Sequence, residues 1–196
     1  SKDEVFYRAE VTHSQTLNDG ALIGYNGIST FTSSANVNVT QFMDQLGYGA
    51  KKTYNRYCFE ESSPVANLFL GLKYMIERDR PVDENIFFVP IYKSGSVTLL
   101  ENKAYLPLGF LTDSQLINVD FNKDITPFMF QNELFSAATG TTQDVWDYIR
   151  GYCLTISSRE EISSMPLSGY CTYDLAGKAK DTIVYSYDVR QNGYAC

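Results

Sequence analysis

The segment SSPVANLFLGLKYMIER, residues 62–78, decides the predicted fold because the spacing of its apolar residues changes from helical to alternating. Ser63 is a preferred N-cap residue, and Pro64 suits the first position of a helix. The expected inner face of this helix consists of Val65, Leu68 and Phe69. The expected inner face of the strand that follows consists of Leu72, Tyr74 and Ile76. A helix that runs directly into a strand is typical of an α+β layer.

Upstream of this segment, the pattern predicts a strand, a long polar loop and a further helix. Residues 6–12 alternate as a strand does, and residues 24–36 are rich in glycine, hydroxyl and amide groups. Asn36 or Asn38 is then expected to cap a helix that ends at Gly47 and Gly49. The apolar stripe of that helix consists of Val39, Phe42, Met43 and Leu46.

Downstream, the sequence predicts three extended segments followed by two helices. The extended segments are residues 86–92, 96–102 and 106–112. Thr126 and Pro127 start the first helix, and Gly140 stops it. The second helix is expected over residues 141–149, capped by Thr141 or Thr142.

The predicted fold class is therefore α+β, with a mixed or antiparallel sheet and about four short helices in the first three quarters of the chain. Two units are expected: an α+β domain at residues 1–150 and a β-rich segment at residues 151–196 that begins a truncated sandwich-like region. The hairpin signal Asn192-Gly193 leaves almost no chain for a returning strand. This favours a cut end over a natural terminus.

Length and charge exclude several classes of function. The chain has 196 residues, enough to bury a proper core, and a net charge of −7. A nucleic-acid partner is not expected, because phosphate neutralisation needs clustered Lys and Arg. No stretch approaches the roughly 18 apolar residues of a transmembrane helix. The sequence has neither an initiating Met nor a signal peptide, so we expect a soluble piece excised from a longer protein.

Cysteine and histidine do not suggest a metal or catalytic site. The cysteines, which form no CxxC pair, are Cys58, Cys153, Cys171 and Cys196. Since only His13 could join them, no zinc site is expected. Two alternatives remain open for these cysteines. They form two disulfides, of which a Cys153–Cys171 bond would close the shortest loop, or they are four thiols. His13 is expected to be structural or at the surface, because it lies beside a predicted strand and the sequence has no GxSxG motif. Neither phosphate-binding loop motif, GxxxxGK[ST] or GxGxxG, is present. No catalytic residue and no metal ligand is assigned.

The most distinctive chemistry of the sequence is aromatic, with 15 tyrosines and 12 phenylalanines. Tyrosine joins a flat apolar face to a hydrogen-bonding tip, which suits stacking under sugar rings. Two loop clusters combine tyrosine with amide, hydroxyl or guanidinium groups, where binding groups tend to gather. The candidate substrate-binding residues are Tyr25, Asn26, Ser29, Asn55, Arg56 and Tyr57. The structural alternatives are core packing of the rings, a tight turn at Asn26-Gly27 and a surface ion pair of Arg56.

Four blocks, in this order, resemble the extracytoplasmic part of the YfhO family of bacterial membrane proteins. They are GYNGISTFTSSANVNVTQFMDQLGY, NRYCFEESSPVANLFLGLKYMIERD, LLENKAYLPLGF and PFMFQNELFSAATG. The resemblance spans residues 6–149 and weakens after that. Four ordered blocks are far more specific than one, because each alone is mostly loop and cap chemistry.

The resemblance implies a function for the full-length protein. Proteins of this family look like multi-pass GT-C glycosyltransferases, which take a sugar from a polyprenyl-phosphate carrier on the outer face of the membrane. The implied acceptor is a cell-envelope polymer such as lipoteichoic acid. The catalytic carboxylate of that class lies near the first membrane helices, so no residue of this chain inherits it. The implied partners are the protein's own transmembrane domain and the glycopolymer, and no cofactor is expected in this part.

Two other classes of function remain open. One is a free-standing carbohydrate-binding or adhesive module that is secreted into the envelope and shares the tyrosine-rich surface. The other is a hydrolase with an unrecognised site, which the missing base disfavours.

Overall fold

A four-stranded mixed sheet forms the centre of the protein, in the order β1-β4-β6-β5. The structure is a computed structural model that describes residues 6–49, 54–60, 62–79, 87–147, 151–153, 160–161 and 185–187. The strands are β1 (Arg8–Val11), β4 (Leu72–Glu77), β5 (Phe88–Ser94) and β6 (Val97–Asn102). β1 and β4 are parallel, whereas β4–β6 and β5–β6 are antiparallel. The predicted mixed sheet is confirmed.

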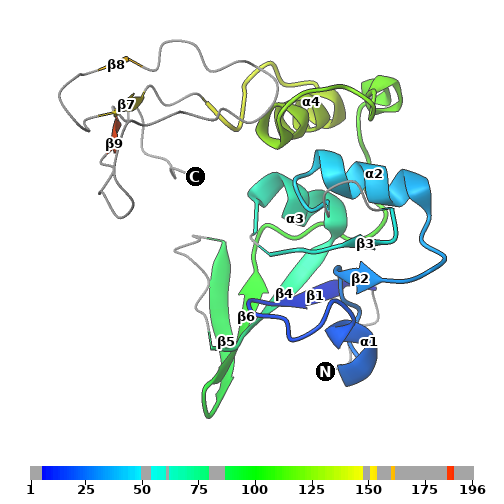
Figure 1. Cartoon of the computed structure of the whole chain (residues 1–196), viewed down its shortest axis with the longest axis vertical. Coiled ribbons are helices and arrows are strands. Elements are labelled where there is room, and N and C mark those ends of the chain that lie inside the picture. Colours follow the sequence, from blue (N-terminus) through cyan, green and yellow to red (C-terminus); the bar gives the residue numbers. More distant parts are fainter. Residues whose placement is uncertain are drawn as a thin grey trace, which may run out of the picture.

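The parallel pair β1–β4 requires a long crossover, and most of the small elements lie in it. In chain order they are α1 (Asp19–Ile23), β2 (Thr30–Phe31), α2 (Val37–Gln45), β3 (Arg56–Tyr57) and α3 (Pro64–Leu70). β2 and β3 pair as a two-stranded antiparallel ribbon. Figure 1 shows α1, β1 and β2 together at one end of the crossover, while α2 and α3 lie toward α4 (Pro127–Thr139).

Side-chain caps fix the starts of the three longest helices described. Asn36, Ser63 and Thr126 each accept a hydrogen bond from a backbone N–H in the first turn of α2, α3 and α4. α3 and α4 end at Gly71 and Gly140, whose left-handed backbone suits glycine. The predicted starts of these helices and the ends of α3 and α4 are confirmed, and of the two candidate caps for α2 the structure uses Asn36. α2 ends at Gln45, with Leu46 as its C-cap, slightly before the predicted glycines.

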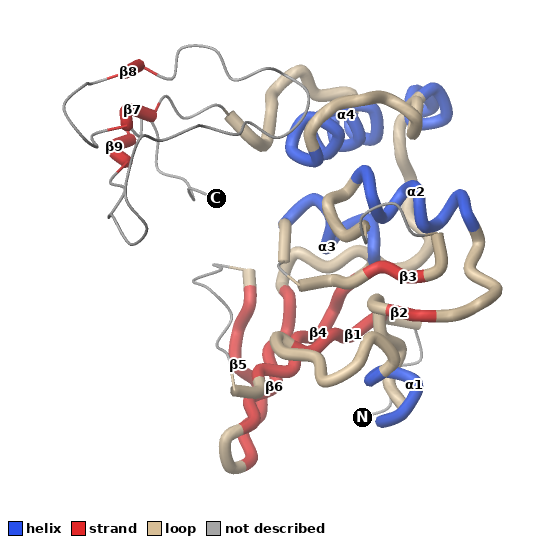
Figure 2. Tube along the Cα trace, in the orientation of Figure 1, coloured by secondary structure: helices blue, strands red, loops and turns tan. Residues whose placement is uncertain are grey.

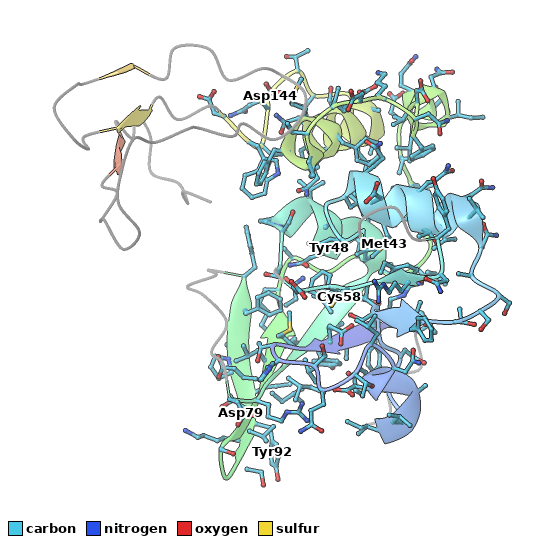
Figure 3. All side chains as sticks on the ribbon, viewed as in Figure 1. Met43, Tyr48, Cys58, Asp79, Tyr92 and Asp144 are labelled. Carbon is cyan, nitrogen blue, oxygen red and sulfur yellow. The ribbon has the colours of Figure 1, made fainter. Side chains whose placement is uncertain are left out.

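The hydrophobic core lies between the helices and the sheet. Its largest fully buried apolar side chains are Phe130, Met43, Leu46, Leu72, Leu134 and Val65. Figure 2 shows α2, α3 and α4 gathered on one side of the four-stranded sheet, and Figure 3 places Met43 and Tyr48 in the middle of the molecule. The helix faces differ slightly from expectation, because Val39 is exposed and α3 buries Ala66 and Asn67 beside Val65.

Strand β4 buries a different face from the predicted one. Leu72 and Met75 are buried, whereas Tyr74 and Ile76 are only partly so. The register against β1 shifts by one residue at Lys73. One extra residue in a strand moves every later side chain to the opposite face, which explains the change.

Residues 106–112 do not form the predicted third extended strand. β6 already has β4 and β5 as neighbours, so this segment has no edge beside β6 to join. It passes α3 instead, where the rings of Phe69 and Phe110 meet edge-on with centroids 5.9 Å apart. The short 3-10 helix η1 (Ser114–Asn118) follows.

The predicted helix over residues 141–149 is wrong for its described part, residues 141–147, which is irregular. The Asn132 side chain accepts the backbone N–H groups of Val145 and Trp146 and donates to the Trp146 carbonyl. These bonds occupy backbone groups that a helix would need. The remaining short helix is α1, which lies directly before the predicted polar loop of residues 24–36.

The C-terminal part contains a separate, three-stranded antiparallel sheet in the order β8-β7-β9. Its strands are β7 (Gly151–Cys153), β8 (Glu160–Glu161) and β9 (Tyr185–Tyr187). They agree with a β-rich C-terminal part and complete the α+β fold class. The division of the chain at residue 150 stays a prediction, and Asn192-Gly193 lies outside the described residues.

Candidate functional site

A pocket of about 300 Å³ lies where α1 meets the β2–β3 ribbon. Its lining residues are Asn18, Gly20, Ala21, Tyr25, Gly27, Ile28, Ser29, Thr30 and Tyr57. Three of the predicted binding residues, Tyr25, Ser29 and Tyr57, therefore meet in one place. The pairing of β2 with β3 brings them together, because Thr30 lies directly opposite Tyr57.

The buried carboxylate of Glu10 holds the loop that forms one wall of the pocket. Its Oε2 accepts the backbone N–H groups of Ile28 and Ser29, at 2.9 and 2.8 Å. Its Oε1 accepts the Val11 N–H at 3.1 Å and the Tyr25 hydroxyl at 3.2 Å. Glu10 is only 2% exposed, so a full set of donors is what makes this burial tolerable.

The hydroxyl of Tyr25 is committed to this carboxylate. Burial raises the pKa of Tyr25 above its ordinary value, and the negative charge of Glu10 raises it further. Tyr25 therefore stays protonated and donates inward to Glu10. The ring of Tyr25 is half-buried and lines the pocket, so the ring is what it offers to a ligand.

Two glycines let the pocket walls approach closely. A Cβ atom on Gly20 would lie 2.9 Å from the Cα and N atoms of Gly27 and 3.0 Å from the Tyr25 carbonyl oxygen. A Cβ atom on Gly27 would lie 3.3 Å from Cε2 of the Tyr25 ring. Larger residues at Gly20 would force the loop away from α1, because backbone atoms are in the way.

Asn18 and Asp19 fasten α1 to its surroundings. The Asn18 side chain donates to the Phe31 carbonyl at 3.1 Å and accepts the Phe31 N–H at 2.8 Å. Burial alone would raise the pKa of Asp19, but hydrogen bonds from Gln15 and Thr16, helped by the Arg78 charge, hold it below its usual value. Asp19 thus remains an anion that ties the turn before α1 to the helix.

The third wall comes from β3 and the residues after it. The Ser29 hydroxyl accepts the Phe59 N–H at 3.0 Å, which joins the loop to the chain beyond β3. Burial raises the pKa of Tyr57, an effect that Arg8 partly offsets. Burial also raises the pKa of the neighbouring free thiol Cys58 to about 11, and Glu60 adds to this rise. Figure 3 shows Cys58 in the middle of the molecule.

Thr30 and Tyr57 have the uncommitted hydroxyls of the pocket. Neither hydroxyl makes a hydrogen bond with any residue that the structure describes, whereas Tyr25, Ser29 and Asn18 use their polar atoms internally. The two residues are directly opposite across the ribbon, so their side chains leave it on the same face. They form an adjacent pair of groups that can both donate and accept.

The other three predicted binding residues do not line the pocket. Asn26 is exposed, and its side chain donates to the Tyr7 carbonyl at 3.3 Å. Asn55 is half-buried, and its carbonyl accepts the Thr32 N–H at 2.9 Å. Arg56 is exposed and directly precedes Tyr57 in β3, so its side chain points to the opposite face of the ribbon. It makes no ion pair with any described residue.

The arrangement can bind hydroxylated molecules, and its lining includes no general base. The lining side chains are aromatic, hydroxyl, amide and small apolar groups, without a carboxylate or an imidazole. His13 lies at the surface and offers its carbonyl to Arg78 at 2.8 Å. Within the described residues, no three His, Cys, Asp or Glu side chains gather as metal ligands would. The disulfide alternatives involving Cys153, Cys171 and Cys196 fall outside the described side chains.

Sequence reasoning missed Glu10, Gly20, Asn18 and Thr30. Glu10 follows Arg8 in the alternation of the first strand, where both would be expected to face water. A weak signal was present in the sequence, because Glu10 stands between the apolar residues Ala9 and Val11. The pairing of Thr30 with Tyr57 could not be found, because it depends on β2 and β3 meeting across residues 32–55.

Comparison with known proteins identifies a family for this chain. A family model described as bacterial membrane protein YfhO matches residues 1–186 and confirms the resemblance seen in the four sequence blocks. Searches of curated proteins and of solved structures returned no significant match. Among the described residues, no helix has the length and apolar character needed to cross a bilayer.

Proposed function

This chain belongs to the YfhO family of bacterial membrane proteins, and on that premise we propose that it is the extracytoplasmic part of a multi-pass glycosyltransferase. The full-length enzyme would take a sugar from a polyprenyl-phosphate carrier and add it to a cell-envelope polymer such as lipoteichoic acid. This part would hold the acceptor or the carrier-linked sugar near a reaction centre that lies elsewhere in the protein. Family membership in a membrane protein favours this over a free-standing secreted module.

One observation supports the proposal above others: side-chain hydrogen bonds hold together the pocket that gathers Tyr25, Ser29 and Tyr57. Glu10 fixes the loop through two backbone N–H groups, and Asn18 fixes α1 to β2. Holding a substrate in the correct place lowers the barrier of a later bimolecular step without any chemistry at the binding site. A preformed pocket without a catalytic base suits such a positioning role.

The proposal is tested in the full-length protein, in membranes. Tyr25→Ala and Arg56→Ala are compared with wild type for sugar added to the envelope polymer, at equal protein level. Tyr92→Ala is the matched control, since Tyr92 is 64% exposed near the turn between β5 and β6 and does not line the pocket.

We expect Tyr25→Ala to lower polymer glycosylation clearly and Tyr92→Ala to leave it at the wild-type level. Arg56→Ala separates two sites, because Arg56 lies on the other face of the ribbon. A loss on Arg56→Ala would extend the binding surface beyond the pocket. Wild-type glycosylation in both Tyr25→Ala and Arg56→Ala would remove the proposed role.

A further inference from the structure

We infer that the pocket takes the ring of an uncharged sugar, held by the Tyr25 and Tyr57 rings and by the Thr30 and Tyr57 hydroxyls, and that it excludes phosphate groups. The inference rests on the proposed function and narrows it to one part of the substrate. It separates the sugar from the two phosphate-bearing partners, the polyprenyl carrier and a phosphate-containing polymer backbone.

The charges around the pocket argue against an anionic ligand. No Lys or Arg lines it, and phosphate sites usually need such a group. Three arginines of the surrounding elements lie outside the lining. Arg8 donates to the Leu70 carbonyl at 2.7 Å, and Arg78 lies 3.8 Å from Asp19 and donates to a backbone carbonyl. Arg56 lies on the other face of the β2–β3 ribbon. The net charge of the chain, −7, repels anions further.

The backbone offers no vacant anion site either. The N–H groups of Ile28 and Ser29 point at one acceptor, as they would in an anion-binding loop, but the Glu10 carboxylate occupies them. Asp19, in the first turn of α1, adds negative charge where a phosphate would otherwise be attracted. A phosphate entering the pocket would find no cationic side chain in its lining, and the two converging N–H groups are already occupied by Glu10.

The groups that remain suit a neutral sugar ring. With its hydroxyl tied to Glu10, Tyr25 presents an aromatic ring with a fixed position. A sugar ring has apolar C–H faces that pack on aromatic rings and hydroxyls that both donate and accept hydrogen bonds. Thr30 and Tyr57 lie side by side on the ribbon and can serve two such hydroxyls. Glu10 does not touch the ligand and acts as a positioning residue.

The test is to titrate small ligands into the full 196-residue chain and to measure their binding by ligand-observed NMR and calorimetry. One arm uses methyl pyranosides, a second uses the matching sugar 1-phosphates, and a third uses glycerol 1-phosphate and inorganic phosphate. The first arm represents the sugar alone, the second the carrier-linked sugar and the third the phosphate of a polymer backbone. Binding of methyl pyranosides, with inorganic phosphate and glycerol phosphate at least about tenfold weaker, is expected.

The first two arms also identify the source of the ring. Equal binding of a methyl pyranoside and the 1-phosphate of the same sugar means that the pocket accepts the carrier-linked sugar, with the phosphate outside. Preference for the methyl pyranoside means that it takes a sugar already on the polymer. Tighter binding of inorganic phosphate or glycerol phosphate, or no binding of any pyranoside, overturns the inference.

Variants test which groups make the contacts. Tyr25→Ala is expected to weaken pyranoside binding about tenfold, and Tyr25→Phe, which keeps the ring, about twofold. Thr30→Val and Tyr57→Phe each remove one free hydroxyl and are expected to cost about fivefold. Tyr92→Ala is the control, and thermal melting confirms that each variant is folded. An equal loss in Tyr25→Phe and Tyr25→Ala contradicts the assigned role of the ring.

The outcome is distinguishable from failure of the proposed function. If Tyr25→Ala weakens pyranoside binding by the chain, but neither Tyr25→Ala nor Arg56→Ala changes polymer glycosylation in membranes, the inference holds and the proposed role in the transferase fails. If glycosylation falls while the chain prefers phosphate, the transferase role holds and the inference fails.

Discussion

Removing the Glu10 carboxylate should loosen the pocket wall and destabilise the whole α+β part of the chain. Glu10→Leu keeps a side chain of similar size but leaves the N–H groups of Ile28 and Ser29 without their acceptor. A buried donor left unsatisfied costs about 1–3 kcal/mol, so we expect the free energy of unfolding to fall by about 2–4 kcal/mol. Glu10→Gln keeps one oxygen for these two donors and should cost about 1–2 kcal/mol.

Urea unfolding followed by the fluorescence of Trp146 measures this directly. Trp146 is the single tryptophan, and its indole N–H donates to the Gln131 side chain at 2.9 Å, on α4. With a slope of about 1–3 kcal/mol per molar urea, the midpoint of Glu10→Leu should fall by about 1–2 M. Far-UV circular dichroism provides a second probe of the same transition.

Glu133→Gln serves as the control, because Glu133 lies at the surface of α4 in an ion pair with Lys123. The free energy of unfolding of this variant should fall by less than about 1 kcal/mol. The expected order of stability is wild type and Glu133→Gln, then Glu10→Gln, then Glu10→Leu. A Glu10→Leu midpoint equal to that of wild type would refute the idea that this carboxylate holds the loop.

Three further predictions follow from the same geometry. In urea unfolding, Gly20→Ala should lower the free energy of unfolding by about 1–3 kcal/mol, because its Cβ would meet backbone atoms 2.9 Å away. Gly109→Ala is the control: a Cβ there has open space around it, so its free energy of unfolding should stay within about 0.5 kcal/mol of wild type. Because the pKa of Asp19 is lowered in the folded state, its carboxylate contributes fully to stability above its ordinary pKa of 3.8, and this stabilisation is lost as the pH falls through the folded pKa. Urea unfolding at stepped pH should therefore show the stability difference between wild type and Asp19→Asn shrinking below pH 3.8. The thiol of Cys58, with its pKa raised to about 11, should react with iodoacetamide at pH 8 more slowly than free cysteine, as peptide mass spectrometry can follow, and equal rates would contradict its buried, uncharged state.

The helices could be predicted where a cap and a stop are both local. Ser63 with Pro64, and Thr126 with Gly140, state where α3 and α4 begin and end within a few residues of sequence. The helix expected over residues 141–149 failed for a non-local reason. Asn132, on the preceding helix, hydrogen-bonds to the backbone of Val145 and Trp146, and no pattern within the segment reports this.

The candidate site was predictable in part for a similar reason. Tyr25 and Ser29 lie in one loop whose composition already suggested binding, and Tyr57 was identified from a second loop cluster. Tyr57 faces the pocket and Arg56 does not, because Tyr57 stands opposite Thr30 in the β2–β3 pair. The register of this pair is set by tertiary structure, so the sequence alone does not show it. Glu10 is the clearest omission, since its burial depends on the loop that its own carboxylate holds in place.

Photo-crosslinking in the full-length protein tests most directly whether this pocket contacts a sugar substrate. Tyr57 is replaced by benzoylphenylalanine, membranes carrying radiolabelled envelope glycopolymer and carrier-linked sugar are irradiated, and labelled protein is counted. The same replacement at Tyr92 is the control. We predict strong labelling at position 57 that a methyl pyranoside suppresses, with background labelling at position 92. Equal labelling at both positions, or none at position 57 in an active enzyme, would contradict a substrate-holding pocket.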